Sequence, residues 1–244
     1  VDGKLTPTRV PPGNVRGGGL SVMGSYPSTN FDFFPYTGLH RPVILYAIPQ
    51  QHIEDVTVVT EVEGDTGVVN VKVTQSGNSS TGKLSLAGEG GTFDVDLTFA
   101  DGVAEATVRV PDARLWCPQD PYLHKLTVTL TEGEQVIDRY ALEIGIRTVV
   151  VKGDKLLLNG EPVFMTGFGK HEDFAVHGRG LNVPLIIKDN SLLKWMGANS
   201  YRTSHYPYSE EAMRVADHEG ILIIDEVPSV GLFFDDGEEN IQTR

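Results

Sequence analysis

The chain has 244 residues, of which 33 are acidic and 20 are basic, and its formal net charge is −13. Nucleic acids and anionic membrane surfaces are both bound by clustered lysine and arginine, so this balance argues against either as a partner. No apolar run approaches the roughly 20 residues that a membrane-spanning helix needs. A single cysteine rules out an intrachain disulfide, and no signal-peptide pattern opens the chain. These features favour a cytoplasmic location but leave the compartment open.

Residues 1–49 begin with turn-forming clusters, PPG at 11–13 and GGG at 17–19, which predict loops. An aromatic-rich stretch follows, and residues 41–48 (RPVILYAI) predict a strand. A segment of this length with so much loop cannot bury a core of its own. We therefore expect these residues to form the end of a domain whose earlier strands precede Val1.

Residues 50–148 have a different periodicity. Apolar and polar residues alternate in several short segments, such as 69–73 (VNVKV), 93–99 (FDVDLTF) and 126–130 (LTVTL). A period of two places one side of a strand in a core and the other in water. About a hundred residues built in this way, with glycine-rich turns between the segments, predict an immunoglobulin-like β-sandwich. The Cys…Trp…Cys framework of antibody domains is not part of the pattern.

Residues 149–244 alternate between strands and helices. Strands are predicted over 163–168, 198–203 and 221–224, and helices over 184–196 and 210–219. The first helix has an apolar stripe formed by Leu185, Ile186, Leu192, Leu193 and Met196. In the second helix, Ser209 is predicted as the N-cap and Gly220 as the C-terminal stop. The order β-α-β-α-β predicts an α/β domain with parallel strands, of which this sequence holds three.

A polar cluster follows each of these three strands, at residues 167–173, 199–207 and 225–226. In parallel α/β folds, ligands bind at the carboxyl ends of the strands. Each cluster alone also has a purely structural interpretation: a solvated loop, bonds from Arg202 to loop carbonyls, or a buried ion pair between Arg202 and a following acid. Because all three clusters follow the ends of neighbouring strands, together they favour a ligand-binding site over these structural interpretations. The two histidines in these clusters, His171 and His205, lack HExxH or comparable ligand spacing, so no metal site is expected.

Several long motifs resemble glycoside hydrolase family 2. Residues 199–224 (NSYRTSHYPYSEEAMRVADHEGILII) resemble the first signature of that family, with Ala212 where a larger apolar residue is usual. Residues 167–173 (GFGKHED) are similar to the β-glucuronidases in particular. Residues 31–46 resemble the end of the family's N-terminal sugar-binding domain, and residues 145–162 its sandwich-to-barrel junction.

This resemblance implies a multidomain β plus α/β enzyme. It assigns residues 1–49 to the C-terminal part of a jelly-roll sugar-binding domain and residues 50–148 to an immunoglobulin-like β-sandwich. Residues 149–244 correspond to the first three β/α units of a TIM (β/α)₈ barrel. The family is retaining, and its two catalytic glutamates follow later barrel strands. We therefore expect no catalytic residue in this sequence, and we expect the chain alone to be inactive.

The resemblance also assigns contacts to individual residues. The predicted substrate-binding residues are Asp32, His171 and His205. The predicted supporting residues are Arg202, Glu172, Asp173 and Glu226. No cofactor and no metal are implied. The expected partners are a glucuronide or other β-glycoside substrate, the remainder of the same enzyme and further copies in a homo-oligomer.

Two alternatives stay open. The chain can belong to a β-galactosidase of the same family, or the sandwich can serve as a non-catalytic carbohydrate-binding or interaction module. An Asn-Glu-Pro motif together with an Asn-x-Lys motif beyond residue 244 would indicate a glucuronidase. The Asn-Glu-Pro motif alone would leave a galactosidase possible, and neither motif would indicate a module. The aglycone preference is not readable from these residues.

Overall fold

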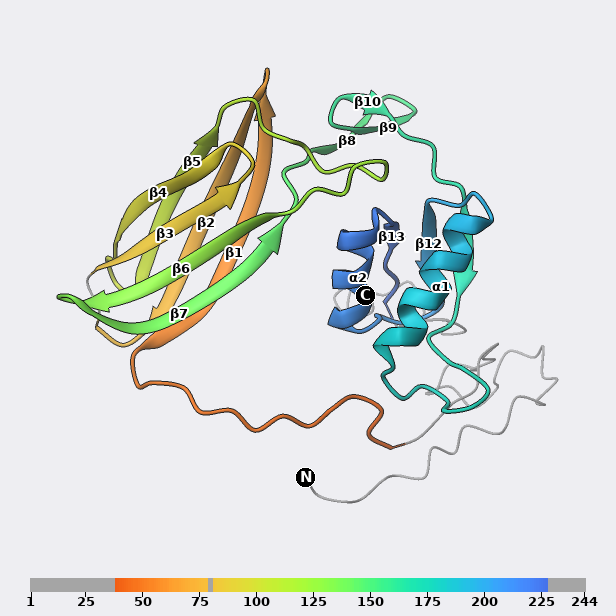
Figure 1. Cartoon of the computed structure of the whole chain (residues 1–244), viewed down its shortest axis with the longest axis horizontal. Helices are drawn as coiled ribbons and strands as arrows, with labels where there is room; N and C mark the ends of the chain where they lie inside the picture. Colours follow the sequence, from red (N-terminus) through yellow and green to blue (C-terminus); the bar gives the residue numbers. More distant parts are fainter. Residues whose placement is uncertain (1–37, 79–80, 228–244) are drawn as a thin grey trace, which may run out of the picture.

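The computed structural model of this protein describes residues 38–78 and 81–227, so Asp32 lies outside the described residues. Figure 1 shows a large antiparallel β-sandwich and a smaller α/β region, with a small three-stranded sheet between them. The described part is therefore mostly β-sheet, with parallel α/β units after it, as the periodicities predict. These residues do not form a closed barrel. None of the helices described is both long enough and apolar enough to cross a membrane.

The sandwich consists of two antiparallel sheets. One has the strand order β1-β2-β5, and the other has the order β4-β3-β6-β7. The strand bounds are β1 His52–Glu63, β2 Thr66–Ser76, β3 Thr81–Gly88, β4 Gly91–Thr98, β5 Val103–Val110, β6 His124–Glu132 and β7 Gln135–Ile144. The three alternating segments named above lie in or at the ends of β2, β4 and β6, so the period-two prediction is confirmed.

A continuous aliphatic core lies between the two sheets. Val73 of β2, Leu84 of β3 and Leu126 of β6 are completely buried, while the residues between such positions along the same strands point outward. Phe93 and Phe99 pack against this core and remain partly exposed. Burial of aliphatic side chains contributes roughly 25 cal/mol per Å² of apolar surface, so this core is the main source of stability in the sandwich.

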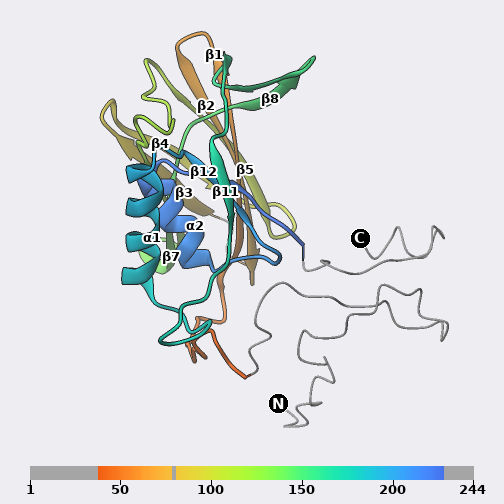
Figure 2. The same ribbon diagram turned by 90° about the vertical axis from the view of Figure 1, so that its right-hand side faces the viewer.

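The α/β region contains three parallel strands in the order β11-β12-β13, with β11 Gly167–Lys170, β12 Ser200–Thr203 and β13 Leu222–Ile224. Helix α1 (Val183–Trp195) connects β11 to β12, and helix α2 (Glu210–Glu219) connects β12 to β13. In Figure 2 both helices lie on the same side of β11. Ser209 caps α2 through its hydroxyl, and Gly220 ends it with a left-handed φ of 71°; both predictions are confirmed.

Three local predictions are wrong. Residues 41–48 do not form a strand: they run as exposed coil, with Leu45 99% exposed, and no described strand pairs with them. The first α/β strand begins at Gly167 rather than at Val163, because the Val163 amide donates to Leu156 in the neighbouring small sheet. That sheet contains β8 Val149–Lys152, β9 Lys155–Leu158 and β10 Glu161–Pro162.

The third correction concerns α1. Its buried residues are Ile186, Asn190 and Leu193, whereas Leu192 and Met196 of the predicted stripe are exposed. Positions spaced by four and three residues share one face of a helix, so this set marks the side that faces the sheet. The apolar residues of α1 extend around more of the helix than one face can bury, which is why composition alone gave the wrong stripe.

Trp116 connects the sandwich to α2. Its side chain is 1% exposed, and its indole N–H donates to the backbone oxygen of Asp217 at 2.7 Å. The guanidinium of Arg147 lies over the ring, 4.7 Å from its centroid. A side chain at Gly220 would place its Cβ 2.4 Å from the backbone oxygen of Pro118. The end of α2 therefore fits against the loop that carries Trp116 only because residue 220 is glycine.

Candidate functional site

The three polar clusters end at one edge of the parallel sheet. The register pairs Lys170 of β11 with Thr203 of β12, and Arg202 with Ile224 of β13. The residues that follow these positions are therefore brought together at the carboxyl ends of the strands, as predicted. Over the described residues, no group of three or more histidine, cysteine or acidic side chains is arranged to hold a metal ion.

Arg202, His205 and Glu226 form a compact charged group at this edge. The Arg202 guanidinium pairs with one oxygen of Glu226, and Nδ1 of His205 lies 2.8 Å from the other. Nδ1 also lies 3.2 Å from Nη1 of Arg202, but one ring nitrogen cannot donate to a carboxylate and accept from a guanidinium together. The shorter contact requires the proton on Nδ1, which leaves Nε2 of a neutral ring as an acceptor.

The electrostatics of this group favour an ionised Glu226. Partial burial raises the pKa of Glu226, but the hydrogen bonds from Arg202 and His205 outweigh it and hold that pKa below its ordinary value. Both carboxylate oxygens are occupied by these partners. This arrangement resembles the ion pair that the sequence offered as the structural interpretation of Arg202, and it also fixes the orientation of His205.

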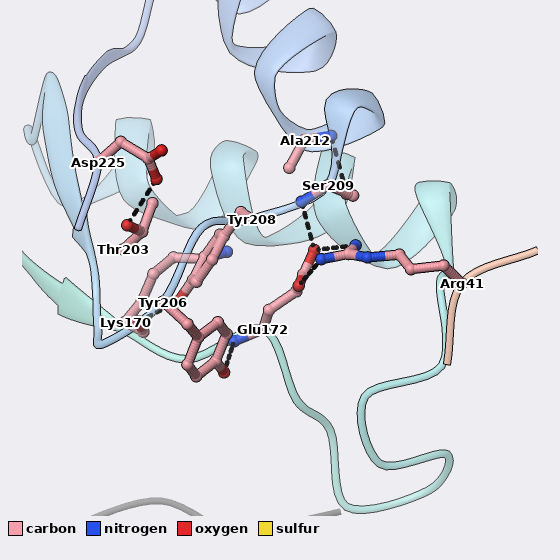
Figure 3. Close-up of polar contacts among 9 residues, drawn as sticks. All are labelled: Arg41, Lys170, Glu172, Thr203, Tyr206, Tyr208, Ser209, Ala212 and Asp225. Carbon is pink, nitrogen blue, oxygen red and sulfur yellow. Dashed lines mark hydrogen bonds and ion pairs between the residues drawn. The ribbon is translucent and has the colours of Figure 1, made fainter. Parts of the chain in front are cut away.

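Thr203 and Asp225 hold the loop after β13 in place. The Thr203 hydroxyl donates to Asp225 at 2.8 Å (Figure 3), and the amide of Glu226 donates to the same hydroxyl at 2.8 Å. Thr203 is completely buried. These bonds position the backbone of Glu226 directly, so its side chain reaches Arg202 from a fixed point.

His171 and His205 lie edge to face, with ring centroids 5.7 Å apart. They come from the loops after β11 and β12, so the structure brings together two of the three predicted substrate-binding residues. Glu172, the next residue, is buried and bonded to Arg41, and Asp173 beside it is half-buried. Asp32 cannot be placed, because it lies outside the described residues.

Glycines on β11 make room for the charged group. A Cβ at Gly169 would lie 2.4 Å from the Ser204 hydroxyl and 2.9 Å from a guanidinium nitrogen of Arg202. At Gly167 it would lie 1.9 Å from the backbone oxygen of Ser200. Real Cβ atoms do not approach so closely, so a side chain at Gly167 would displace β12, and one at Gly169 would displace Ser204 or Arg202.

Three tyrosines support the site from the side of the helices, and the sequence reasoning did not single them out individually. Tyr201, Tyr206 and Tyr208 are each at least 93% buried, with exposed fractions of 2%, 6% and 7%. Burial raises the pKa of all three phenols, so they remain neutral. Tyr208 donates to the backbone oxygen of Lys170, and the Lys170 ammonium lies 5.1 Å from the centre of the Tyr201 ring.

Arg41 was missed altogether. It belongs to residues 31–46, which indicated a domain end, and to residues 41–48, which predicted a strand, but neither prediction gave Arg41 a role. Its partner Glu172 is 131 residues away. A basic residue in an otherwise apolar exposed segment is a weak signal, and no local pattern relates it to an acid so distant in the sequence.

Comparison with known proteins gives a consistent result. Residues 51–147 match a family model described as glycosyl hydrolases family 2, and residues 149–243 match the model for the TIM barrel domain of that family. β-Glucuronidase from Rattus norvegicus is 41% identical over 260 aligned residues, covering 100% of this chain and 39% of the relative. The Mus musculus enzyme is 43% identical, covering 95% of this chain and 37% of the relative.

A solved structure of β-glucuronidase from Ruminococcus gnavus in complex with D-glucuronic acid has 40% identity and a TM-score of 0.75. The match covers 83% of this chain and 35% of that chain. The chain thus spans about two fifths of the length of the curated relatives it matches. Two family models that together match most of its residues, and relatives at about 40% identity, agree with the motifs. This chain belongs to glycosyl hydrolase family 2.

Proposed function

We propose that this chain is part of a retaining exo-glycosidase that hydrolyses β-D-glucuronides. The observation that carries the proposal is the group formed by His171, His205, Arg202 and Glu226 at the carboxyl ends of parallel strands. Relatives that are named β-glucuronidase support glucuronides over galactosides. The R. gnavus relative was solved in complex with D-glucuronic acid, which supports a uronic acid as the sugar.

We further propose the domain assignment that the family suggests. Residues 1–49 are the C-terminal part of a jelly-roll sugar-binding domain, and residues 50–148 are an immunoglobulin-like sandwich. Residues 149–244 supply the first three β/α units of a TIM barrel. Two antiparallel sheets facing each other and the β11-α1-β12-α2-β13 order support this division.

Each side chain in the group has a distinct proposed role. His171 and His205 contact the sugar, because an imidazole can donate to a hydroxyl and accept from one. Arg202 is a fixed cation that favours ionised carboxylates nearby. Glu226 orients His205 and Arg202 and is not the nucleophile, since both of its oxygens are already engaged.

The two catalytic carboxylates are proposed to lie outside these 244 residues. Retaining glycosidases need a nucleophile and an acid/base about 5–5.5 Å apart, and the sequence contains no Asn-Glu-Pro motif. Hydrolysis therefore requires the remainder of the enzyme. A homo-oligomer is also proposed, which light scattering of the full-length protein tests directly.

The function is tested with two polypeptides and two substrates. The full-length enzyme and the 244-residue chain are each assayed with a chromogenic β-glucuronide and the β-galactoside of the same aglycone. We expect the full-length enzyme to prefer the glucuronide and the 244-residue chain to hydrolyse neither. Preference for the galactoside would overturn the substrate assignment. Turnover by the 244-residue chain at the full-length rate would show that its own acids are catalytic.

A further inference from the structure

The carboxylate of Glu172 lies just beyond the end of β11, with 9% of its side chain exposed. Arg41 donates to both of its oxygens, from Nη1 to Oε1 at 2.9 Å and from Nη2 to Oε2 at 2.8 Å. The backbone amide of Ser209 donates to Oε1 at 3.1 Å. Figure 3 shows Arg41 and Ser209 approaching this carboxylate from different sides. A buried carboxylate is tolerated where such partners replace water, so its position is closely fixed.

These bonds join three segments that are distant in the sequence. Arg41 belongs to the extended segment at 38–50, which also accepts a backbone bond from Leu181 at the oxygen of His40, at 3.2 Å. Ser209 is the N-cap of α2. The amide of Glu172 itself lies 3.2 Å from the hydroxyl of Tyr206. The N-terminal segment, the end of β11 and the loop before α2 thus meet at one acid.

The same bonds bracket both histidines of the site. His171 is the residue before Glu172, so the peptide between them carries the amide that contacts Tyr206. His205 is the residue before Tyr206, in the loop whose end is held by the Ser209 amide. The two rings lie 5.7 Å apart. A shift of Glu172 would therefore move both loops and change the spacing of the two imidazoles.

We propose that Arg41 and Glu172 are positioning residues that set the relative placement of His171 and His205 by tying the segment at 38–50 to the ends of β11 and β12. The proposal rests on the proposed glycosidase function. A bidentate guanidinium–carboxylate pair fixes distance and plane together, which a lysine cannot do. Misplacement by about 1 Å can reduce a rate about a hundredfold, so a modest change in this pair has a measurable consequence.

The test uses full-length enzyme with Arg41→Lys, which keeps the charge but loses the fork, and Glu172→Gln, which keeps an acceptor for Ser209. Each is expected to lower kcat/KM about tenfold. Each of the two changes is then also made in the double variant His171→Ala/His205→Ala, which lacks both imidazole rings. There the further loss is expected to fall below about twofold. Equal losses in both backgrounds would overturn the proposal, because a merely structural effect does not depend on the histidines.

A matched control exists on the sandwich. Arg109 also contacts both oxygens of an acid, Glu63, at 2.8 and 3.4 Å, but both side chains are more than half exposed. Arg109→Lys makes the same chemical change far from the site. It is expected to leave kcat/KM within about twofold of the wild type. Melting temperatures of all variants are measured in parallel, and the kinetic constants are expressed per folded molecule.

Two further readouts separate this proposal from the proposed function. The losses in kcat/KM, with and without the two histidines, are measured on whichever of the glucuronide and the galactoside the wild type hydrolyses. A wrong substrate assignment therefore leaves the comparison of the two backgrounds measurable. Hydrogen exchange needs no substrate: Glu172→Ala, which removes the acceptor of the Ser209 amide, is expected to raise exchange there about tenfold, and Arg41→Lys, which loosens that acceptor, is expected to raise it by a smaller factor. Unchanged exchange at the Ser209 amide would show that Arg41 and Glu172 do not hold the loop before α2. Normal glucuronide hydrolysis by the wild type, together with equal losses in both histidine backgrounds, would show that they hold the loop but do not position the histidines.

Discussion

The sandwich and the α/β region cover their sheets with different kinds of side chain. In the sandwich the buried hydrophobic cluster is aliphatic, with members such as Val73 and Leu126, and it forms one core between two sheets. In the α/β region Tyr201 of β12 and Tyr208 of the loop that follows pack with residues of the two helices, while Arg202, also on β12, pairs with Glu226. Stability and chemistry are therefore distributed differently: the first region supplies an apolar core, and the second positions polar groups.

Trp116 connects the two regions, because it lies in a loop of the sandwich and its indole is bonded to α2. A change at this residue therefore tests whether the two regions depend on each other for stability. Trp116→Ala is expected to cost about 3–5 kcal/mol, since it removes a buried aromatic ring and its bond to Asp217. Chemical denaturation followed by circular dichroism gives the free energy of unfolding. Trp116→Phe keeps most of the bulk and should lose only about 1 kcal/mol for the hydrogen bond. A loss below about 1 kcal/mol for Trp116→Ala would mean that the regions are stable independently.

A second change tests whether the sandwich core affects stability alone or also the site. Leu126→Ala is expected to cost about 2–5 kcal/mol, because it leaves a cavity in a completely buried position. It should leave kcat/KM per folded full-length molecule unchanged, since Leu126 packs in the sandwich core and contacts none of the site residues. Val59→Ala on β1, where the side chain is 54% exposed, is the control and should cost less than about 0.5 kcal/mol. An altered kcat/KM for Leu126→Ala would link the sandwich core to the site.

The third change asks what the first 49 residues add to the α/β region. Asp32→Ala in the full-length enzyme is expected to lower kcat/KM about ten- to a hundredfold, because a charged hydrogen bond to a sugar hydroxyl contributes roughly 1.5–3 kcal/mol. The melting temperature should change little, since a turn cap contributes only ~1 kcal/mol. Unchanged activity per folded molecule with a lower melting temperature would assign Asp32 to the fold instead of the sugar.

The smallest expected effect concerns the charged group and depends on pH. The pKa of Glu226 is lowered in the folded state, so its ionised form contributes stability above the ordinary value of about 4.3. That contribution is lost as the pH falls through the lower folded-state pKa. Glu226→Gln should therefore be less stable than the wild type at pH 7, by about 1 kcal/mol or less because its partners are partly exposed. The difference should disappear in strong acid; a difference that grows there would contradict the assigned direction.

Much of the fold was predictable because its signals are local. Period-two alternation identified several strands of the sandwich, and Ser209 and Gly220 marked the ends of α2 because a cap depends only on adjacent residues. The convergence of three polar clusters followed from a general rule for parallel strands. The start of β11 was not predictable, since an apolar residue such as Val163 carries no information about which strand it will join.

The pairs that organise the site and the junction were less accessible. Arg41 and Glu172 are 131 residues apart, and Trp116 and Asp217 are 101 apart. Neither pair forms a motif, and the second uses a backbone oxygen, which is identical at every position. Such contacts are consequences of the folded geometry and can be found only once the elements are in place.

Gly169 has a consequence for how substitution data on this protein would be interpreted. A Cβ there collides with the Ser204 hydroxyl and the Arg202 guanidinium and would push them aside, so a saturation library screened for activity should favour glycine at this position. An intolerance map would then rank Gly169 beside the residues proposed to bind the sugar. Its intolerance would instead report the space that the Ser204 hydroxyl and the arginine occupy, and a library that varies positions 169, 202 and 204 together is the one that can tell the two apart.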